Sequence, residues 1–484
     1  MSLKKTVAIA TAVGAMAAIS VPAMAMENEI HGMYKLKYIV SDADNGGASY
    51  ITPNASNEKL KANNFFEQRA RLFYTAKAND DLKLVTGFEI DSVFGDKAQG
   101  AINPGNVASG ALTYRNSGGA LESDAVNLET KHVYLDFKIP STPTRVTAGI
   151  QPIKDALKGV FFDADVAGIN TVSKVGPATI GLGYFRAYDQ SYFMTATTPK
   201  GMNNLDIVAL NADVNLTKDL KVGAAYYLYS DNRDNTPTKL HTLGVNADAK
   251  FGPLGVSGFA AMQQGVKGGS STVAHTVYNG YAFNGAAKLA IGPGALRTAL
   301  LFTSGDDGKD GINTSWQSVN QSLNAPSTGL SGTAPATNSY NDSNMMLLNR
   351  SVNMGGTSTD RAIIYDTNNR DQGVWLASIG YDATITPKMY ASANAGCAWV
   401  AKHNAVTNLI VDKATGKPNG SNFQGTEINL ETGYKMYDNL TASVQAAYVI
   451  LGGYYKGSAA DSTASAVKDP ENPYTARVVL SYAF

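Results

Sequence analysis

The chain has 484 residues, of which 44% are hydrophobic and 17% charged, whereas roughly a quarter of the residues of a soluble domain are charged. Its 40 basic and 40 acidic residues cancel, so there is no overall basic field for nucleic acid. The lone Cys397 excludes an intrachain disulfide framework and a cysteine-based metal site, and no CxxCH haem motif is present. The 47 glycines and 25 tyrosines favour β structure with many turns.

Residues 1–25 have the pattern of a secretory signal peptide. Lys4 and Lys5 form a basic start, residues 6–21 are apolar, and "AMA" at 23–25 is a small-x-small cleavage site. The apolar run is shorter than the roughly 20 residues that a membrane-spanning helix needs. We therefore expect cleavage after Ala25 and an exported chain, 26–484, that forms one domain. If that chain is a membrane protein, it has to be a β-barrel.

Alternating apolar and polar residues predict strands along the whole mature chain. In "RARLFYTAKA", for example, Leu72 and Tyr74 share one face, whereas Arg69 and Arg71 share the other. The expected strands are 29–40, 65–78, 82–94, 127–138, 144–152, 166–174, 178–187, 205–217, 220–230, 240–251, 254–264, 276–291, 295–304, 373–386, 388–400, 425–436, 440–452 and 474–484. These are about eighteen; without 166–174, and with one merger elsewhere, sixteen are possible.

The connections between these strands sort by length. Eight short turns, among them "NDDL" and "YDNL", follow even-numbered strands, and nine longer connections follow odd-numbered ones. Bacterial outer-membrane barrels have short periplasmic turns and long extracellular loops. The pattern predicts an all-β fold, a transmembrane antiparallel β-barrel with both termini on the short-turn side. A soluble β-sandwich would also alternate, but this many strands in one soluble domain would be unusual.

The final segment, "YTARVVLSYAF", alternates as well and ends on aromatic-x-aromatic. In a closed barrel it pairs with the first strand, and Tyr482 and Phe484 lie in the periplasmic aromatic girdle. Here the sequence resembles the outer-membrane porins of Gram-negative bacteria. Locally, "FFEQRARLFY", "VYLDFKIPSTPTRVTAGIQPI" and "GVFFDADVAGI" are similar to porins of metal- and sulfur-respiring proteobacteria. The resemblance implies that the barrel-assembly machinery reads Tyr482 and Phe484, and that the protein forms a homotrimer in the outer membrane.

Charged residues on the inward faces are the candidates for lining the pore. The basic ones are Lys35, Lys37, Arg69, Arg71, Lys77, Lys131 and Arg145, and the acidic ones are Glu67, Glu89, Asp91 and Asp136. We expect Arg69, Arg71 and Lys77 to form a short basic ladder, and a basic wall opposite an acidic one to create a transverse field that sets ion selectivity. The other interpretation is that each charge is paired and structural.

The connection "KDALKGVFFDADVAG", 154–168, is apolar in its middle and acidic at its flanks. An exposed loop seldom carries "VFF". In the porins that the sequence resembles, the third loop folds inward and narrows the channel. We expect the segment near 153–168 to fold inward and form the constriction, with Asp163 and Asp165 as its acidic face. Packing at the barrel rim or at a subunit contact is the alternative.

The longest connection, near 304–372, is rich in Ser, Asn, Thr and Gly, and we expect a solvated extracellular loop. Its "GDDGKDGIN" faintly resembles a calcium loop through Asp306, Asp307, Asp310 and Asn313. It lacks the spacing and the terminal Glu of such loops, so no metal or other cofactor is expected. The five histidines are scattered and no HExxH, GxSxG or P-loop motif is present, so we expect no enzyme.

These observations favour a passive, water-filled channel for ions and small hydrophilic solutes. The first strand begins within about five residues of the cleavage site, which leaves no room for an N-terminal plug. Two alternatives stay open at this point. One is a substrate-specific channel, for instance a sugar channel with an aromatic track in its lumen. The other is a structural barrel associated with an electron-transfer or adhesion partner.

Overall fold

The computed structural model describes most of the chain after the first 26 residues. The described residues are 27–43, 62–95, 128–189, 203–232, 237–268, 275–308, 311–319, 338–349, 351, 354, 362–364, 366–403, 410–460 and 467–484. The expected signal peptide therefore lies outside the described residues. Among the described residues no helix is long and apolar enough to span a membrane.

Alternating segments form one large antiparallel sheet. Its wall strands are β1 (Glu27–Ser41), β2 (Asn63–Asn79), β3 (Leu82–Val93), β4 (Glu129–Lys138), β5 (Thr144–Lys154), β6 (Asp163–Val175), β7 (Ala178–Asp189), β8 (Asn204–Thr217), β9 (Leu220–Asp231), β10 (Thr238–Phe251), β11 (Leu254–Lys267), β13 (Tyr281–Ile291), β14 (Gly294–Thr303), β16 (Val374–Thr386), β17 (Met389–Trp399), β20 (Phe423–Tyr437), β21 (Leu440–Leu451) and β24 (Tyr474–Ala483). All eighteen predicted strands are confirmed, with 276–291 interrupted between β12 and β13.

Short elements occupy the longer connections. They are β12 (Thr276–Tyr278), β15 (Ile312–Asn313), β18 (Val411–Asp412), β19 (Lys417–Pro418), β22 (Ala459–Ala460), β23 (Val467–Lys468), and the single-turn helices η5 (Asn341–Ser343) and η6 (Gly453–Tyr455). Of the twenty strands in the main sheet, β12 and β15 extend it locally at the long-connection end, and the other eighteen form the wall.

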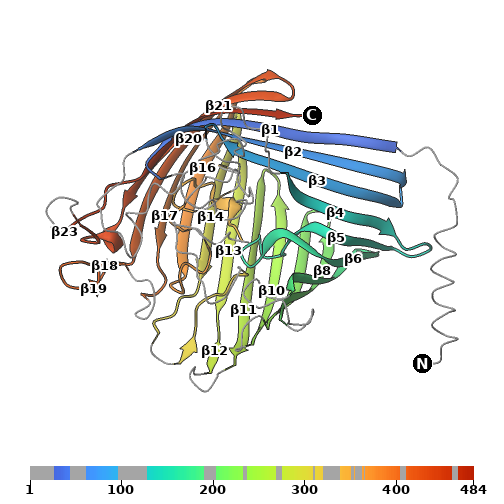
Figure 1. Ribbon diagram of the computed structural model, residues 1–484, viewed down its shortest axis with the longest axis horizontal. Coiled ribbons are helices and arrows are strands. Elements are labelled where there is room, and N and C mark those ends of the chain that lie inside the picture. Colours follow the sequence, from blue (N-terminus) through green and yellow to red (C-terminus); the bar gives the residue numbers. More distant parts are fainter. Residues whose placement is uncertain are drawn as a thin grey trace, which may run out of the picture.

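The sheet closes on itself. The first strand, β1, pairs with β2 on one side and with the last strand, β24, on the other, from Met33 opposite Ala483 to Ser41 opposite Thr475. Figure 1 shows this closure as the blue first strand beside the red carboxyl-terminal strand. The fold is an antiparallel eighteen-stranded β-barrel, as the sequence predicts. Closure leaves no free strand edge along the wall, because every strand has two neighbours.

The two faces of the wall differ in polarity. Outward side chains are large and apolar, and many are exposed, for example Ile169, Leu182 and Leu243. Inward side chains include buried polar and charged groups such as Glu427 and Arg477. The exposure of many large apolar side chains on the outside is unlike the surface of a soluble domain, and it is what a barrel surrounded by lipid requires.

The β5–β6 hairpin leaves the wall near its tip. Pairing of β4 with β5 ends at Ile150, and pairing of β6 with β7 starts at Gly168. Residues 151–167 therefore pair with each other but with neither flanking strand. In Figure 1 the teal hairpin departs from the row of strands. Because its tip contacts inward residues of β9, β10 and β11, it extends into the barrel interior.

The hydrophobic core of the molecule lies inside the barrel. It joins the hairpin tip, with Leu157, Phe161 and Phe162, to inward wall residues and to Trp316 and Met345–Leu348 of the longest connection. Our expectation of a solvated segment at 304–372 is wrong for its described part, most of which is buried. The physical reason is the apolar run Met345–Leu348, which packs in this core instead of facing water.

Candidate channel lining and constriction

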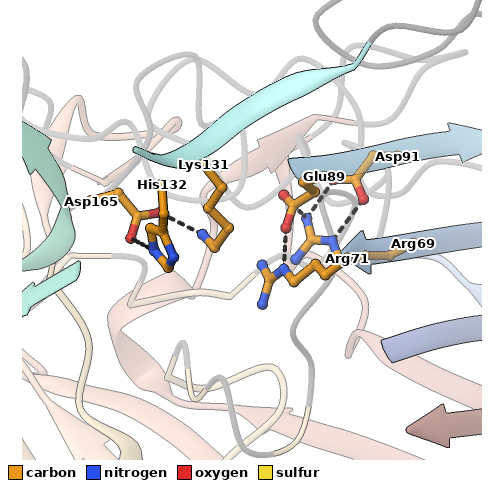
Figure 2. Close-up of polar contacts among 7 residues, drawn as sticks. All are labelled: Arg69, Arg71, Glu89, Asp91, Lys131, His132 and Asp165. Atoms are coloured by element: carbon orange, nitrogen blue, oxygen red, sulfur yellow. Dashed lines mark hydrogen bonds and ion pairs between the residues drawn. The ribbon is translucent and has the colours of Figure 1, made fainter. Parts of the chain in front are cut away.

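The arginines of β2 are held by carboxylates of β3, the adjacent strand. The antiparallel register places Arg69 opposite Asp91 and Arg71 opposite Glu89. Arg69 donates to both oxygens of Asp91, at 2.7 Å from Nε and 2.5 Å from Nη2, and its Nη2 lies 3.3 Å from Glu89. Arg71 donates to Glu89 through its Nε. Figure 2 shows these four side chains together.

This pairing corrects our expectation of a transverse field. The two arginines and the two carboxylates lie on adjacent strands of one wall, so their charges largely cancel each other locally. They therefore do not form a basic wall opposite an acidic one. Lys77 lies apart from them, near the turn, where it pairs with Glu27 at 3.2 Å and Asp80 at 3.1 Å. It does not extend a basic ladder from Arg69 and Arg71.

Two of the remaining basic candidates, Lys37 and Arg145, also lie next to acidic residues of neighbouring strands, whereas Lys35 lies opposite another basic residue. Lys35 lies opposite Arg69 in the register, and Lys37 lies opposite Glu67, with both Lys37 and Glu67 fully buried. On the other side of the cluster, Arg145 donates to Asp136 at 2.5 Å, and Lys83 lies 3.6 Å from the same carboxylate. The sequence named these residues as candidates for inward faces, but it could not supply the pairs, which depend on the register of neighbouring strands.

A bulge directs two further side chains towards the hairpin. Gly87 pairs with His132 and Phe88 with Thr130, so Lys131 is the extra residue of β4. Asp165 of β6 accepts from Lys131 at 2.5 Å and contacts the His132 Nε2 at 2.9 Å (Figure 2). These contacts attach the base of the hairpin to β4, which it no longer meets through backbone hydrogen bonds.

The hairpin tip is organised around one buried carboxylate, Asp155. Its Oδ1 accepts from the backbone N–H groups of Leu157 and Gly159, at 2.7 and 2.9 Å, and its Oδ2 from those of Phe161 and Phe162, at 2.8 and 2.5 Å. Burial raises the pKa of Asp155 to about 6, and the four hydrogen bonds oppose that rise. The carboxylate thereby satisfies four donors that have no strand partner.

The tip then contacts wall strands beyond its immediate neighbours, and the longest connection. The Ala156 N–H donates to the Tyr227 hydroxyl of β9 at 2.7 Å, and Phe161 packs against the rings of Tyr227 and Trp316. Lys158 donates to Ser257 of β11 at 2.9 Å. Of the two acidic candidates, Asp163 lies beside the tip, where it pairs with Lys154 at 3.0 Å and accepts from Ser339 at 3.1 Å. Asp165 lies nearer the hairpin base and binds Lys131 and His132 of β4.

The longest connection is fixed to the wall by a second buried carboxylate. Glu427 of β20 accepts from the backbone N–H groups of Met346, Leu347 and Leu348, at 2.7, 2.9 and 2.5 Å. Arg477 of β24, also buried, donates to the Met354 carbonyl at 3.4 Å. Sequence reasoning missed both groups. The sequence did contain one signal for them: charged residues at inward positions of two strands, together with the apolar run Met345–Leu348 in the longest connection.

Beneath these loops the lumen retains polar space. A cavity of about 440 Å³ is bordered by charged residues of the loops and wall, among them Lys158, Lys221, Asp248, Lys288 and Arg297. A second cavity of about 450 Å³ shares Lys288 and Arg297 with it and reaches β16, β17 and β20. Arg297 is held by Asp382 at 2.5 and 2.7 Å. Both cavities are lined by groups that favour water and ions over apolar solutes.

The calcium motif does not gather ligands in the described part of the chain. Asp306 accepts from the Gly308 and Thr314 N–H groups, at 2.9 and 3.1 Å, and these bonds order the loop. Among the described residues no group of three or more His, Cys, Asp or Glu side chains could hold a metal ion. Asp310 lies outside the described residues.

The carboxyl-terminal aromatic pair sits at the closure of the barrel. The Gly32 N–H donates to the Phe484 carbonyl at 2.8 Å, and the Phe484 N–H donates to the Gly32 carbonyl at 3.1 Å. The Tyr482 and Phe484 rings stack with centroids 5.5 Å apart, and both are partly exposed. A side chain at position 32 would collide with the Phe484 ring, since a Cβ there would lie 2.7 Å from its Cζ.

The fold is similar to that of solved bacterial structures, one of which is described as an outer membrane protein. The chain resembles the outer membrane protein opdK of Pseudomonas aeruginosa (TM-score 0.51, 12% identity, 95% of this chain and 98% of that one). It also resembles OccAB1 of Acinetobacter baumannii (0.51, 12%, 94% and 96%) and OpdL of Pseudomonas aeruginosa (0.50, 10%, 95% and 99%). No protein-family model and no curated relative matches the sequence. At these identities the likeness establishes the fold.

Proposed function

We propose that the protein is an outer-membrane porin, a passive channel for ions and small hydrophilic solutes. The observation that carries this proposal is the closed barrel with an apolar outer wall and charged, cavity-containing interior. Such an interior stabilises water and ions, whereas the outer wall suits the hydrocarbon of a membrane. The similarity of the fold to that of the outer membrane protein opdK supports a location in the outer membrane.

The constriction in this proposal is formed by the β5–β6 hairpin together with the longest connection. The tip spans from its own strands to β9 and β11, and it packs against Trp316 and Met345–Leu348. Asp163 and Asp165 contribute acidic groups on the hairpin, each beside a lysine. Solutes then pass through the polar space that the loops leave beside the wall. We expect size exclusion to follow from this narrowing.

Liposomes that contain the refolded barrel test this function. They should release small entrapped solutes, such as sucrose, and retain a large dextran. Retention of both solutes by liposomes whose barrel is shown to be folded, by resistance to denaturation in detergent, would contradict an open channel. Release of the dextran would contradict the constriction.

We further propose that residues 1–25 are removed on export, that the assembly machinery of the outer membrane reads the Tyr482–Phe484 end, and that three copies associate. Phe484→Ala should lower the yield of folded protein in the outer membrane, because it removes the terminal ring that we propose is recognised. The backbone hydrogen bonds between residue 484 and Gly32 persist in this variant, so the test isolates the ring. Phe251→Ala, another exposed aromatic residue at the short-turn end, is the matched control. Equal yields from both variants would exclude a signal in the terminal ring.

A further inference from the structure

A row of aromatic rings crosses the inward face of β1, β2 and β4. His31 and Phe73 are register partners on β1 and β2, and their rings stack at 5.2 Å with an angle of 15°. Phe73 continues to His132 at 5.4 Å, and His132 meets the Tyr134 edge at 6.2 Å. We call these four residues the aromatic row. All four residues lie on the inward faces of their strands, as do the paired charges Arg69, Arg71, Glu89 and Asp91.

Gly87 makes the row continuous. It is the β3 residue between Phe73 and His132 in the register. A Cβ at Gly87 would lie 2.8 Å from the Cδ1 and Cε1 atoms of Phe73 and 3.2 Å from the His132 Cβ. Because glycine leaves this space empty, the Phe73 ring can lie across β3 and meet His132. Any other residue there would displace the ring from the row.

The row is accessible from the lumen. His31 is exposed, and Phe73 and Tyr134 are half-buried, although all three lie on the inward face of the wall. By contrast, the apolar side chains of the hairpin tip and the longest connection are buried against each other. The row thus presents ring surface to the interior that the packing of the loops does not cover.

Polar groups lie next to the row on the same inward faces of β2 and β3, two residues along each strand in the direction away from the short turn. Arg71 precedes Phe73 on its face of β2, and Glu89 lies beside it on β3. Arg71 donates to Glu89 through Nε, and within the described part of the chain its two terminal nitrogens make no hydrogen bond. Its side chain is 28% exposed. Successive residues on one strand face are about 7 Å apart, so a six-membered ring solute can touch both levels.

We propose that the aromatic row and the Arg71–Glu89 pair form a binding site for pyranose sugars inside the channel. One face of a pyranose carries C–H groups, which pack on the electron-rich faces of aromatic rings. Its ring hydroxyls accept from the Arg71 nitrogens and donate to Glu89. Figure 2 shows Arg71 and Glu89 in one group and Lys131, His132 and Asp165 in a neighbouring one, with β2, β3 and β4 adjacent in the same wall. This inference rests on the proposed channel function, and it names a solute class for that channel.

The charge balance also favours a neutral sugar over an ion. Arg71 and Glu89 are paired with each other, and Lys131 and His132 are paired with Asp165. The site therefore offers donors and acceptors without a large net charge. A neutral polyhydroxy ring is recognised by such a site through directed hydrogen bonds and ring stacking.

The test is titration of D-glucose against the ion current of single channels, with sorbitol as a matched control. Sorbitol has the same number of carbons but no ring face. Glucose should produce saturable, transient reductions of the current, and sorbitol should produce none at equal concentration. Phe73→Leu should weaken glucose binding between about twofold and tenfold, because the sugar loses its contact with one aromatic ring, which is comparable in energy to an aromatic pair. Gly87→Ala should weaken it as well by displacing the Phe73 ring, with every row residue still present.

Phe283→Leu is the matched control variant, because Phe283 packs against Phe302 and Trp375 on the outward face. It should leave glucose binding unchanged. Equal responses to glucose and sorbitol in the wild type would overturn the sugar site, and so would an unchanged glucose affinity in both Phe73→Leu and Gly87→Ala. These failures leave the current itself intact. Absence of any current would instead refute the proposed channel function.

Discussion

Asp155→Ala should release the hairpin from the barrel interior. The substitution removes the acceptors of four buried backbone N–H groups, those of Leu157, Gly159, Phe161 and Phe162. A buried donor without an acceptor costs about 1–3 kcal/mol. Even at about 1 kcal/mol each, four such donors shift the docking equilibrium of the tip by about 4 kcal/mol, which is roughly a thousandfold.

Two assays report on this release. Trypsin should cut the variant after Lys154 or Lys158 at least tenfold faster than it cuts the wild type. Single-channel records of the variant should show a larger, noisier current, because the proposed constriction opens. Unfolding of the barrel should remain unchanged, since the wall strands keep their pairing.

Asp163→Ala provides the control on the same hairpin. It removes a partly exposed ion pair with Lys154 and a hydrogen bond from Ser339, together worth at most about 2 kcal/mol. The reasoning would be refuted if Asp155→Ala matched Asp163→Ala in protection from trypsin and in current noise. That result would mean that the apolar contacts of the tip hold it without the carboxylate.

Three further predictions concern pH, the longest connection and ion selectivity. Burial raises the pKa of docked Asp155 to about 6, whereas the released hairpin exposes the carboxyl at its ordinary pKa near 3.8, so docking should strengthen as pH falls from 7 to 4 and weaken as it rises through 6. Current noise that grows on acidification would contradict this sign. Glu427→Gln places an amide NH₂ against the N–H donors of Met346–Leu348 and should raise the conductance by loosening that segment, at a cost of about 2 kcal/mol; unchanged hydrogen exchange of these amides would argue against it. Replacing Arg69 and Arg71 by neutral residues leaves Asp91 and its neighbours uncompensated and should shift the reversal potential towards cation selectivity; no shift would place the pair away from the narrowest point.

The wall of the barrel was predictable because each strand has one lipid face and one polar face. Alternation of period two follows directly from that difference, and short Asn, Asp, Gly and Pro turns mark one end. The pairing of Arg69 with Asp91 was not predictable, because it depends on an irregularity of the strand near the turn. The turn after Asn79 would place Arg69 opposite Ser92, and a register shift between Lys77 and Asn79 moves it to Asp91. Only that shift puts both charges on the same face.

The contents of the lumen were less predictable, because they depend on contacts distant in sequence. The apolar residues Phe161 and Phe162 suggested an inward fold, but their partner Trp316 is more than 150 residues away. Composition classed the longest connection as solvated, since Ser, Asn and Thr dominate it. Those side chains instead form buried hydrogen bonds, as Asn368 does with the Trp316 carbonyl at 2.7 Å. The aromatic row likewise required coordinates, because its continuity depends on Gly87 on the intervening strand.

The most direct test of the channel proposal is the single-channel conductance of the refolded protein in a planar bilayer with a salt gradient across it. The account predicts stable, stepwise currents on the nanosiemens scale or below, with a reversal potential that gives the sign of the selectivity. A folded barrel that inserts into the bilayer and carries no current would contradict it. The interior would then be closed by the hairpin and the longest connection, and the protein would be a structural barrel.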